Sequence, residues 1–461
     1  MSASHVESAT STGNAGYAGQ SWAVFGLGLT GLSCARFLSA RGARVSVFDT
    51  RAAPPSLAAA RQIAPPVALH CGDIDGESLR GYRHIAVSPG IALEHPALAR
   101  AREAGAEIVG DIELFAQNVA SPVVAITGSN GKSTVTTLVW RILEAAGRSV
   151  RAGANLGTPA LDLVSSPEPD CYVLELSSFQ LDLTTSLAPA VACILNITAD
   201  HIDRHGSFEA YREAKARILP RARQAVLNAD DPAVASLAAR LDAVDWIAPD
   251  SRDPAHYRVA EHDGQRWLWR REIPLLPVSE LKIAGRHNEF NALAAIAITA
   301  LLGVDADAQR RALRAFDGLA HRCRLVADAR GVRWFNDSKG TNIGATIAAI
   351  NGLVTDTTAI LIAGGQGKGA DFRELRAAVN GRVRIAVLIG EDAPLLAQAI
   401  EDLTQIRLAD SLQEAVRIAA AVAREGEIVL LSPACASLDM FANYEERGRV
   451  FEDAVHEVVA S

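Results

Sequence analysis

A glycine-rich loop at residues 127–134, TGSNGKST, contains the residue types that bind nucleotide phosphates. It follows the apolar run PVVAI and precedes the helical pattern VTTLVWRILEAAG, so backbone N–H groups and a helix N-terminus can surround phosphate oxygens. Two glycines let the backbone approach, Lys132 places a charge on the phosphates, and a following hydroxyl reaches Mg²⁺. Ile126 stands where the strict pattern has its first glycine, which leaves an ordinary strand-to-helix turn as the alternative. The predicted nucleotide contacts are Gly128, Ser129, Asn130, Gly131, Lys132, Ser133 and Thr134.

Acidic and histidine side chains follow two later apolar runs. Glu175 ends CYVLEL, where an acidic residue in a phosphate-loop protein commonly meets the metal or its water. Asn196, Asp200, His201 and Asp203 lie together in LNITADHIDRH and offer oxygen and imidazole ligands on one loop. A surface carboxylate and a structural histidine are the alternatives. The clustering after strand ends favours a metal or catalytic role for His201.

A second glycine motif lies near the start of the chain. Gly26, Gly28 and Gly31 have the G-x-G-x-x-G spacing, and Asp49 follows 18 residues after Gly31. This pattern is typical of dinucleotide-binding turns, although alone it is a weak signal. A nicotinamide-dependent oxidoreductase or a nucleotide sensor therefore stays open at this point.

The elements that must position these residues alternate in β-α-β order. The runs SWAVFGLG, ARVSVFD and HIAVSPG, then PVVAIT, CYVLELS and AVACILNIT, then VRWFND, TAILIAGG, RIAVLIG and EIVLLSP read as strands with helices between them. This order predicts an α/β protein of three domains: a Rossmann-like N-terminal domain at 21–115, a central parallel-sheet domain of the P-loop ATPase type at 116–320, and a Rossmann-like C-terminal domain at 321–461. Residues 1–20 are expected to form a flexible tail.

The composition narrows the class of ligand. Hydrophobic residues make up 49% of the 461 residues and the net charge is −8, which is typical of a soluble α/β protein and argues against nucleic acid or an anionic membrane as partner. The six cysteines show no CxxC pair, so we expect most of them to be buried apolar residues. No secretory signal and no apolar run of about 18 residues is visible, which predicts a cytoplasmic protein without a membrane span.

Five motifs together resemble the Mur ligases of bacterial peptidoglycan synthesis: TGSNGKST, ELSSFQL, NITADHIDRH, AGRHNEFNALAA and NDSKGTN. Within that family, GLGLTGLS, SPGIAL, GDIELF and LLSPACASLDMF look like the members that add D-glutamate to UDP-N-acetylmuramoyl-L-alanine, and the likeness runs from Ser21 to the end. The resemblance implies ATP-dependent amide formation through an acyl phosphate. A related ligase that adds another residue, including L-glutamate, and a folylpolyglutamate synthase are the alternatives. A UDP-binding first domain would have no purpose in the folate enzyme.

The resemblance also implies roles for individual residues around the reacting groups. Lys132 would stabilise the transferring phosphoryl group, while Ser133 and Glu175 would hold one Mg²⁺ and His201 a second. Lys215 stands where the family carries a carbamylated lysine; a solvated lysine on a charged helix is the alternative. Carbamylation reverses the sign of a charge that would otherwise repel Mg²⁺ by several kcal/mol.

Three sets of substrate contacts complete what the resemblance implies, and we expect the chain to act as a monomer. The UDP substrate would contact Gly28, Leu29, Thr30, Asp49, Thr50, Arg51, Ser88, Pro89, Gly90, Asn155, Ser177 and Gln180. ATP would also contact Asn288, Asn291, Arg322, Asp337 and Lys339, although Asn288 could instead be a helix cap. Glutamate would contact Thr341, Lys368, Ser437 and Tyr444. Gly340 and Tyr444 depart from the alanine and phenylalanine that the family often has there, which leaves the enantiomer of glutamate open.

Overall fold

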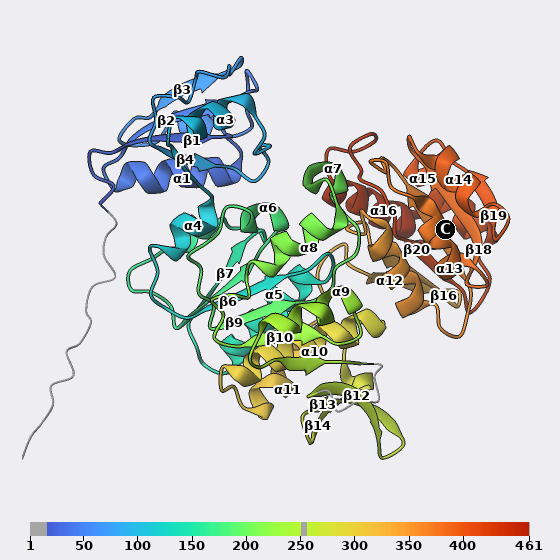
Figure 1. Ribbon diagram of the computed structural model, residues 1–461. Helices are drawn as coiled ribbons and strands as arrows, with labels where there is room; N and C mark the ends of the chain where they lie inside the picture. The colour runs from blue at the N-terminus through green and yellow to red at the C-terminus, as the bar shows by residue number, and fades with distance from the viewer. Residues whose placement is uncertain (1–15, 250–255, 461) are drawn as a thin grey trace, which may run out of the picture.

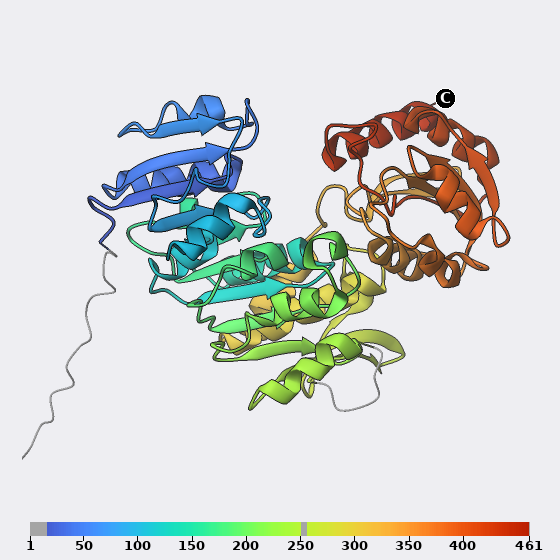
Figure 2. The same ribbon diagram turned by 45° about the horizontal axis from the view of Figure 1, so that its top comes forward.

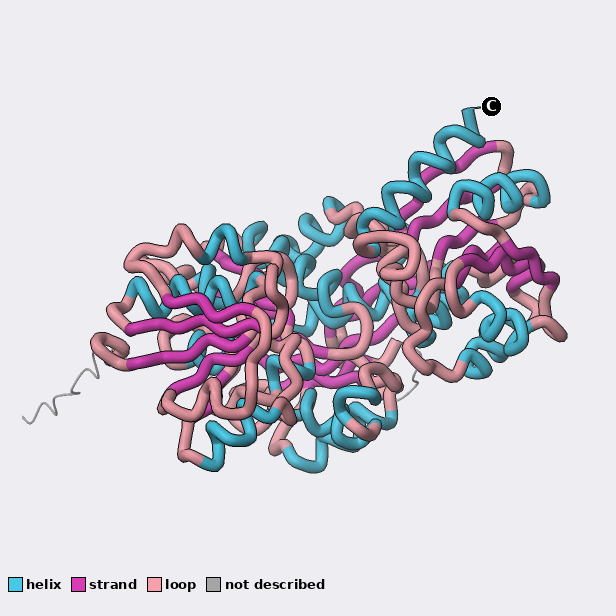
Figure 3. Tube along the Cα trace, turned by 90° about the horizontal axis from the view of Figure 1, so that it is seen from above, coloured by secondary structure: helices cyan, strands magenta, loops and turns pink. Residues whose placement is uncertain are grey.

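The computed structural model describes residues 16–249 and 256–460, which form three lobes, each built on its own sheet. The second lobe lies between the first and the third (Figures 1 and 2). Viewed from above, the strands gather in separate groups with helices around them (Figure 3). The predicted α/β class is confirmed. The three sheets fall within the predicted domain ranges, and the boundaries themselves stay a prediction.

The first lobe is a five-stranded parallel sheet in the order β3-β2-β1-β4-β5. The order reverses between β1 and β4, and ligands of such sheets bind outside the carboxyl ends of the strands at that point. The strands are β1 (Ser21–Phe25), β2 (Arg44–Asp49), β3 (Ala68–Cys71), β4 (His84–Val87) and β5 (Glu107–Val109). The helices are α1 (Leu29–Ala40), α2 (Leu57–Ala60), α3 (Pro96–Glu103) and α4 (Asp111–Ala116).

Most of the predicted tail lies outside the described residues, but its end is packed. Tyr17 is only 3% exposed, its ring contacts Trp22 and Phe37, and its hydroxyl accepts a hydrogen bond from Asn118. The ordered chain therefore begins before Ser21, because a single aromatic residue anchors the segment that precedes β1.

The second lobe has nine strands in the order β14-β13-β12-β11-β10-β9-β6-β8-β7. The strands are β6 (Val123–Thr127), β7 (Val150–Ala154), β8 (Cys171–Glu175), β9 (Val191–Ile194), β10 (Ala225–Asn228), β11 (Asp245–Ile247), β12 (Tyr257–His262), β13 (Gln265–Arg270) and β14 (Ile273–Pro277). The α-helices are α5 (Lys132–Ala145), α6 (Ser178–Leu181), α7 (Ile202–His205), α8 (Phe208–Ala216), α9 (Pro232–Ala235), α10 (Arg286–Leu301) and α11 (Ala306–Ala315). Three 3₁₀ turns are η1 (Ala160–Leu163), η2 (Ser236–Arg240) and η3 (Val278–Glu280).

One part of this sheet differs from the parallel order predicted for the central domain. β12, β13 and β14 pair antiparallel. The turn between β12 and β13 is Asp263-Gly264, and both residues have positive φ (51° and 72°). That turn chemistry favours a tight hairpin over a helical crossover, so a local signal overrides the β-α-β rhythm here.

The third lobe has six strands in the order β15-β16-β20-β17-β18-β19, parallel except for the β15–β16 hairpin. The strands are β15 (Arg324–Ala329), β16 (Val332–Asn336), β17 (Ala359–Gly364), β18 (Val383–Ile389), β19 (Gln405–Leu408) and β20 (Ile428–Leu431). The helices are α12 (Ile343–Leu353), the 3₁₀ turn η4 (Phe372–Leu375), α13 (Arg376–Val379), α14 (Ala393–Ile400), α15 (Leu412–Val422) and α16 (Tyr444–Ala460).

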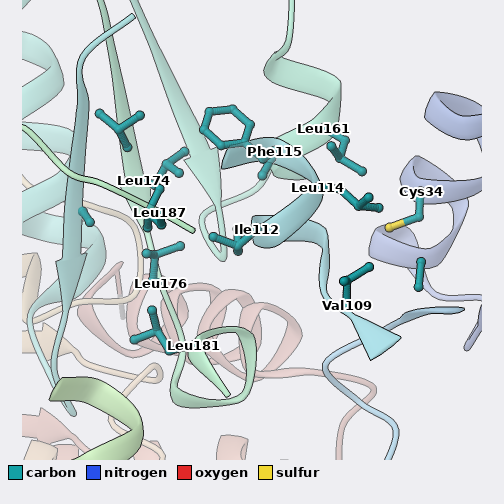
Figure 4. Packing of buried hydrophobic residues seen from close by; sticks show 14 of the residues in the cluster. Cys34, Val109, Ile112, Leu114, Phe115, Leu161, Leu174, Leu176, Leu181 and Leu187 are labelled. Atoms are coloured by element: carbon teal, nitrogen blue, oxygen red, sulfur yellow. The ribbon is translucent and has the colours of Figure 1, made fainter. Parts of the chain in front are cut away.

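The cores of the first two lobes are continuous through α4. Ile112, Leu114 and Phe115 are fully buried and belong to one cluster with Cys34 of α1 and Leu174 of β8 (Figure 4). The first lobe is therefore held against the second by apolar packing. All six cysteines are free and all but Cys71 are buried, as predicted. Among the described residues, no helix is long and apolar enough to cross a bilayer.

Candidate active site

Loops from all three lobes border one cavity of ≈ 400 Å³. The second lobe contributes the phosphate loop, the end of β8, the segment before α7, and α8, because the carboxyl ends of parallel strands meet at one edge of a sheet. The predicted residues that line this cavity are Pro89, Gly90, Ser129, Asn130, Gly131, Lys132, Ser133, Asn155, Glu175, Ser177, His201, Lys215, Arg322, Lys339, Thr341 and Tyr444.

The phosphate loop is fixed by its neighbours. Gly131 has φ +82° at the N-cap of α5, and a Cβ there would lie 2.5 Å from Oδ1 of Asn291. The N–H of Asn130 donates to Oδ1 of Asn196 at 2.8 Å. Position 131 thus requires glycine for two reasons: its backbone has a positive φ, and α10 approaches too closely to leave room for a Cβ.

Two lysines share one carbonyl at the base of this loop. Nζ of Lys132 donates to the carbonyls of Gly128 (2.8 Å) and Ser129 (2.9 Å), and Nζ of Lys215 donates to the same Gly128 carbonyl at 2.9 Å. Burial lowers the pKa of Lys132, against the opposing charge of Glu175. Burial, helped by the charge of Lys132, holds the pKa of Lys215 well below its usual range. Both amines are therefore closer to losing a proton than an exposed lysine.

Glu175 has an oxygen that no described residue satisfies. Its Oε1 accepts from Nδ2 of Asn155 at 2.6 Å, whereas Oε2 is buried without a hydrogen-bond partner. In the same cavity, Oγ of Ser133 accepts from Nη2 of Arg322 at 2.7 Å. An orphaned carboxylate oxygen and a hydroxyl that line one cavity suit a hard cation such as Mg²⁺. Among the described residues, no three His, Cys, Asp or Glu side chains form a metal cage, so water or substrate oxygens would complete the shell of such an ion.

His201 presents its ring to the cavity from a constrained backbone. It has φ +55° at the N-cap of α7, and its side chain is 42% exposed. Burial lowers the pKa of this imidazole, and the carboxylate of Asp200, 3.7 Å away, opposes the shift. The ring centroid lies 4.9 Å from that of Phe179. The neutral form that burial favours is the form that ligates metals.

A second cavity of ≈ 780 Å³ opens at the switch point of the first sheet. Burial alone would raise the pKa of Asp49, but hydrogen bonds from the Arg51 side chain and the Leu27 N–H outweigh it and lower that pKa. Asp49 is therefore an anion held in place at the cavity wall. The predicted UDP contacts that line this cavity are Gly28, Leu29, Thr30, Asp49, Thr50, Arg51, Ser88, Pro89, Gly90, Asn155 and Gln180. Ser177 lines the ≈ 400 Å³ cavity instead.

A third, smaller cavity of ≈ 110 Å³ lies between α10 and the start of the third lobe. Asn288 is not the cap of α10, because Gly285 occupies that position and Asn288 donates to the Ala284 carbonyl. Nδ2 of Asn291 donates to Oδ1 of Asn288 at 3.1 Å, so the two amides face the same side. The predicted ATP contacts that line this cavity are Asn130, Gly131, Thr134, Asn288, Asn291, Arg322, Asp337 and Lys339.

Comparison with known proteins fits this geometry. Residues 20–110 match the Mur ligase MurD-like N-terminal domain, residues 126–299 the Mur ligase middle domain, and residues 321–435 the Mur ligase glutamate ligase domain. A UDP-N-acetylmuramoylalanine--D-glutamate ligase of Nitrosococcus oceani is 48% identical over 437 residues, which cover 95% of this chain and 96% of that one. The ligase of the same name from Pseudomonas aeruginosa is 49% identical over 94% of this chain and 97% of its own.

The chain belongs to the Mur ligase family.

Solved structures agree at the level of the fold. A pseudomurein peptide ligase of Methanothermus fervidus superposes with a TM-score of 0.61 at 19% identity, covering 95% of this chain and 100% of its own. A UDP-N-acetylmuramate-alanine ligase of Thermotoga maritima gives 0.61 at 17% identity, covering 95% and 99%. Membership in the Mur ligase family displaces the alternative in which the Gly26 loop belongs to a nicotinamide-dependent oxidoreductase.

The four residues predicted for glutamate divide into two groups in this Mur ligase. Thr341 and Tyr444 line the ≈ 400 Å³ cavity. Lys368 is exposed and Ser437 is only 4% exposed, and neither lines any of the three cavities. The charge of Lys368 nevertheless lowers the pKa of His201, so it faces the same side of the molecule.

Two predicted positions have local structural roles as well. Ser177 and Gln180 form a capping box at the start of α6, and Gln180 also donates to Asp111 at 3.0 Å.

The glycine at position 340, where the family often has alanine, has a physical explanation. A Cβ there would lie 2.6 Å from Oδ2 of Asp337.

The ring of Tyr444 lies beneath a lysine. Nζ of Lys339 is 3.8 Å from the ring centroid, and burial lowers the pKa of Lys339 to about 8. A tyrosine at this position therefore holds a cation by its ring face.

Sequence reasoning missed three residues of the site. The hydroxyl of Tyr211 hydrogen bonds to Oγ of Ser129 at 3.0 Å, and its spacing of four from Lys215 on α8 was a usable signal. Arg204 donates to the Ile91 carbonyl of the first lobe, and Asn342 of the third lobe donates to Asp200. These last two contacts cross between lobes, so no local pattern could indicate them.

Proposed function

We propose that this Mur ligase joins D-glutamate to UDP-N-acetylmuramoyl-L-alanine with hydrolysis of ATP to ADP and phosphate. The observation that supports this best is that the cation-lined cavity around the phosphate loop adjoins a cavity suited to a UDP substrate, with Gly90 and Asn155 among the residues that line both. Relatives named for this reaction are 48–49% identical over nearly the whole chain.

The reaction would run in two balanced steps. An oxygen of the L-alanine carboxylate attacks the γ-phosphorus of ATP, the bond to the β-phosphate oxygen breaks, and ADP leaves. The amine nitrogen of glutamate then attacks the acyl carbon, phosphate leaves with the C–O electron pair, and the amine gives up a proton. Negative charge builds on phosphoryl and carbonyl oxygens in both steps, so the residues must supply positioned positive charge.

The chain's own cations are placed for this task. Lys132 would exchange its two carbonyl partners for phosphate oxygens, because both bonds come from the loop that would wrap ATP. Arg322 and Lys339 would approach the same phosphates from the third lobe. Mg²⁺ held by Ser133 and Glu175, and a second Mg²⁺ held by His201 and a modified Lys215, would neutralise oxygens that these side chains do not reach.

The surroundings of Lys215 support its carbamylation. The residue is 1% exposed, donates to the Gly128 carbonyl, and faces the charge of Lys132. Its neutral amine could attack the carbon of CO₂, lose a proton to solvent and become a carbamate anion. That change turns a disfavoured cation into an anion next to a cation, which lowers the free energy of the site.

The remaining predictions fit the same scheme. Asn288, Asn291 and Asp337 would contact the adenosine part of ATP, and Lys368 and Ser437 would contact glutamate after the third lobe moves. The enzyme would act in the cytoplasm, where ATP is available. It would act as a monomer, because one chain supplies every residue proposed for the three substrates.

The test is a phosphate-release assay with ATP, Mg²⁺ and UDP-N-acetylmuramoyl-L-alanine, given D-glutamate or L-glutamate separately. We expect release with D-glutamate alone, and none when either acceptor or amino acid is left out. Release with L-glutamate instead would identify a related ligase, and full turnover by Lys132→Ala would contradict the assignment of the phosphate loop.

A further inference from the structure

A row of five side chains connects the two groups proposed to hold the second Mg²⁺. The ring of His201 meets Phe179 edge-on at 4.9 Å, and Phe179 stacks on His205 at 5.2 Å with 5° between the planes. His205 lies 5.3 Å from Tyr211, and the ammonium of Lys215 is 4.5 Å from the Tyr211 ring centroid. The row therefore begins at His201 and ends at Lys215, with His205 in its middle.

His205 is buried more deeply than His201. Its side chain is 6% exposed, whereas that of His201 is 42% exposed. Nε2 of His205 is 3.0 Å from Oγ of Ser178, and Nδ1 is 3.7 Å from Oδ2 of Asp182. Both partners belong to the segment around α6, so His205 attaches α7 to that segment.

The segment that carries His201 is short, and its other contacts come from Asp200, which accepts from Asn342, and from Arg204, which donates to the Ile91 carbonyl. α7 spans only four residues, and none of them is classed as fully buried over the whole residue. A helix of this length gains little stability from its own hydrogen bonds and depends on side-chain packing. The His201 ring thus packs on Phe179, and Phe179 is itself contacted by the stacked ring of His205 and by the guanidinium of Arg204, 4.8 Å from its centroid.

We propose that His205 is a positioning residue that sets the spacing of His201 and Lys215 by filling the gap between Phe179 and Tyr211 with a flat ring. The inference rests on the proposed function, in which both end residues hold one Mg²⁺. Groups behind metal ligands commonly change metal affinity or activity by about 10–100-fold when they are removed. Here the supporting group acts through the stacking of its flat ring, which does not require the hydrogen bond to Ser178.

Two apolar variants distinguish the effect of a flat ring at position 205 from the effect of simply filling the space. His205→Phe keeps a flat ring and His205→Leu does not, while both lose the hydrogen bond to Ser178. Mn²⁺ binding is measured by the loss of the free-ion electron paramagnetic resonance signal, with a non-hydrolysable ATP analogue present. We expect two Mn²⁺ per unsubstituted chain, and about 10–100-fold weaker binding of one of them in His205→Leu. His205→Phe should stay close to the unsubstituted chain in both affinities.

A matched control is His70→Leu, since His70 also stacks on a phenylalanine, Phe48, at 4.7 Å, but lies in the first lobe. It should leave both Mn²⁺ affinities unchanged. Equal Mn²⁺ binding by His205→Leu and the unsubstituted chain would overturn this inference and leave the proposed function intact. A loss of Mn²⁺ affinity in His205→Phe as large as that in His205→Leu would do the same. Fewer than two Mn²⁺ in the unsubstituted chain would overturn both the inference and the metal part of the proposed function. Absence of D-glutamate-dependent phosphate release would contradict the proposed reaction itself.

Discussion

At the scale of single residues, the decisive feature is the pair of lysines on the Gly128 carbonyl. Two ammonium groups on one acceptor repel each other, and burial removes the water that would screen them. Neither Lys132 nor Lys215 has a carboxylate at hydrogen-bond distance among the described residues. The site therefore stores unfavourable charge that ATP phosphates and a carbamate would relieve.

We expect Lys215→Ala to lower the turnover number by about 10²–10³-fold or more, the usual effect of losing one charge-stabilising group. The melting temperature should change little, because the variant removes a buried group whose charge, as ammonium or as carbamate, is costly to desolvate. Phosphate release and thermal unfolding measure the two effects. A ¹³C-bicarbonate NMR signal of a lysine carbamate should be present in the unsubstituted chain and absent from the variant. The exposed Lys282→Ala is the control, and turnover in Lys215→Ala equal to that control would remove Lys215 from the site.

At the scale of elements, sequence patterns located the two glycine-rich loops but missed the antiparallel strands at one edge of the second sheet. Residues 127–134 and the Gly26 motif could be placed because each combines glycine spacing with a strand before it and a helix after it. The antiparallel strands β12 to β14 were missed, although Asp263-Gly264 is a hairpin signal. The contacts made by Arg204 and Asn342 could not be predicted, because they depend on how separate lobes meet.

The Gly26 motif offers a matched pair of substitutions. A Cβ at Gly31 would lie 1.7 Å from the Gly26 carbonyl oxygen, because α1 packs directly on the loop that precedes it. A Cβ at Gly28 would meet nothing within 4 Å. We expect Gly31→Ala to cost at least the about 1–3 kcal/mol typical of overpacking, and Gly28→Ala to cost far less. Denaturant unfolding of the whole chain, followed by circular dichroism, checks this, and equal stability of the two variants would contradict the close approach.

The helix α4 carries a buried acid whose ionisation opposes folding. Asp111 is 1% exposed, its Oδ1 has no partner, and burial raises its pKa to about 6, against the hydrogen bond from Gln180. Because this folded-state pKa lies above the unfolded value of 3.8, the contribution to stability is present below pH 4 and is lost as the pH rises through about 6.

Asp111→Asn should therefore match the unsubstituted chain at pH 4 and be more stable at pH 8, by up to about 3 kcal/mol for a shift of about two pKa units. Chemical denaturation at the two pH values measures the difference. Glu113→Gln on the same helix is the contrast: its pKa is lowered by hydrogen bonds from Thr185 and Ser186, although burial raises it. That variant should lose stability at pH 8. A stability difference for Asp111→Asn that does not grow with pH would show that Asp111 is not neutral in the folded chain at acidic pH.

At the scale of the whole molecule, the residues proposed for three substrates come from three lobes that are joined unequally. The first and second lobes share a continuous core through α4. The third has core clusters of its own and meets the second where α12 packs on α10 and through polar contacts such as Arg322 to Ser133 and Asn342 to Asp200. An interface without a shared apolar core is easily rearranged, so we expect the third lobe to be the one that moves.

Closure of the third lobe would explain why Lys368 and Ser437 do not line the cavity that Thr341 and Tyr444 line. If the lobe swings inward when nucleotide and UDP substrate bind, Lys368 would approach the segment around His201, whose pKa its charge already lowers. We expect small-angle X-ray scattering to show a smaller radius of gyration with the UDP substrate and a non-hydrolysable ATP analogue than with neither. Lys368→Met should compact to the same extent but raise the KM for glutamate, because a long flexible ammonium pairs with the side-chain carboxylate. An unchanged radius of gyration would count against closure, and an unchanged KM would place Lys368 outside the glutamate site even in the closed form.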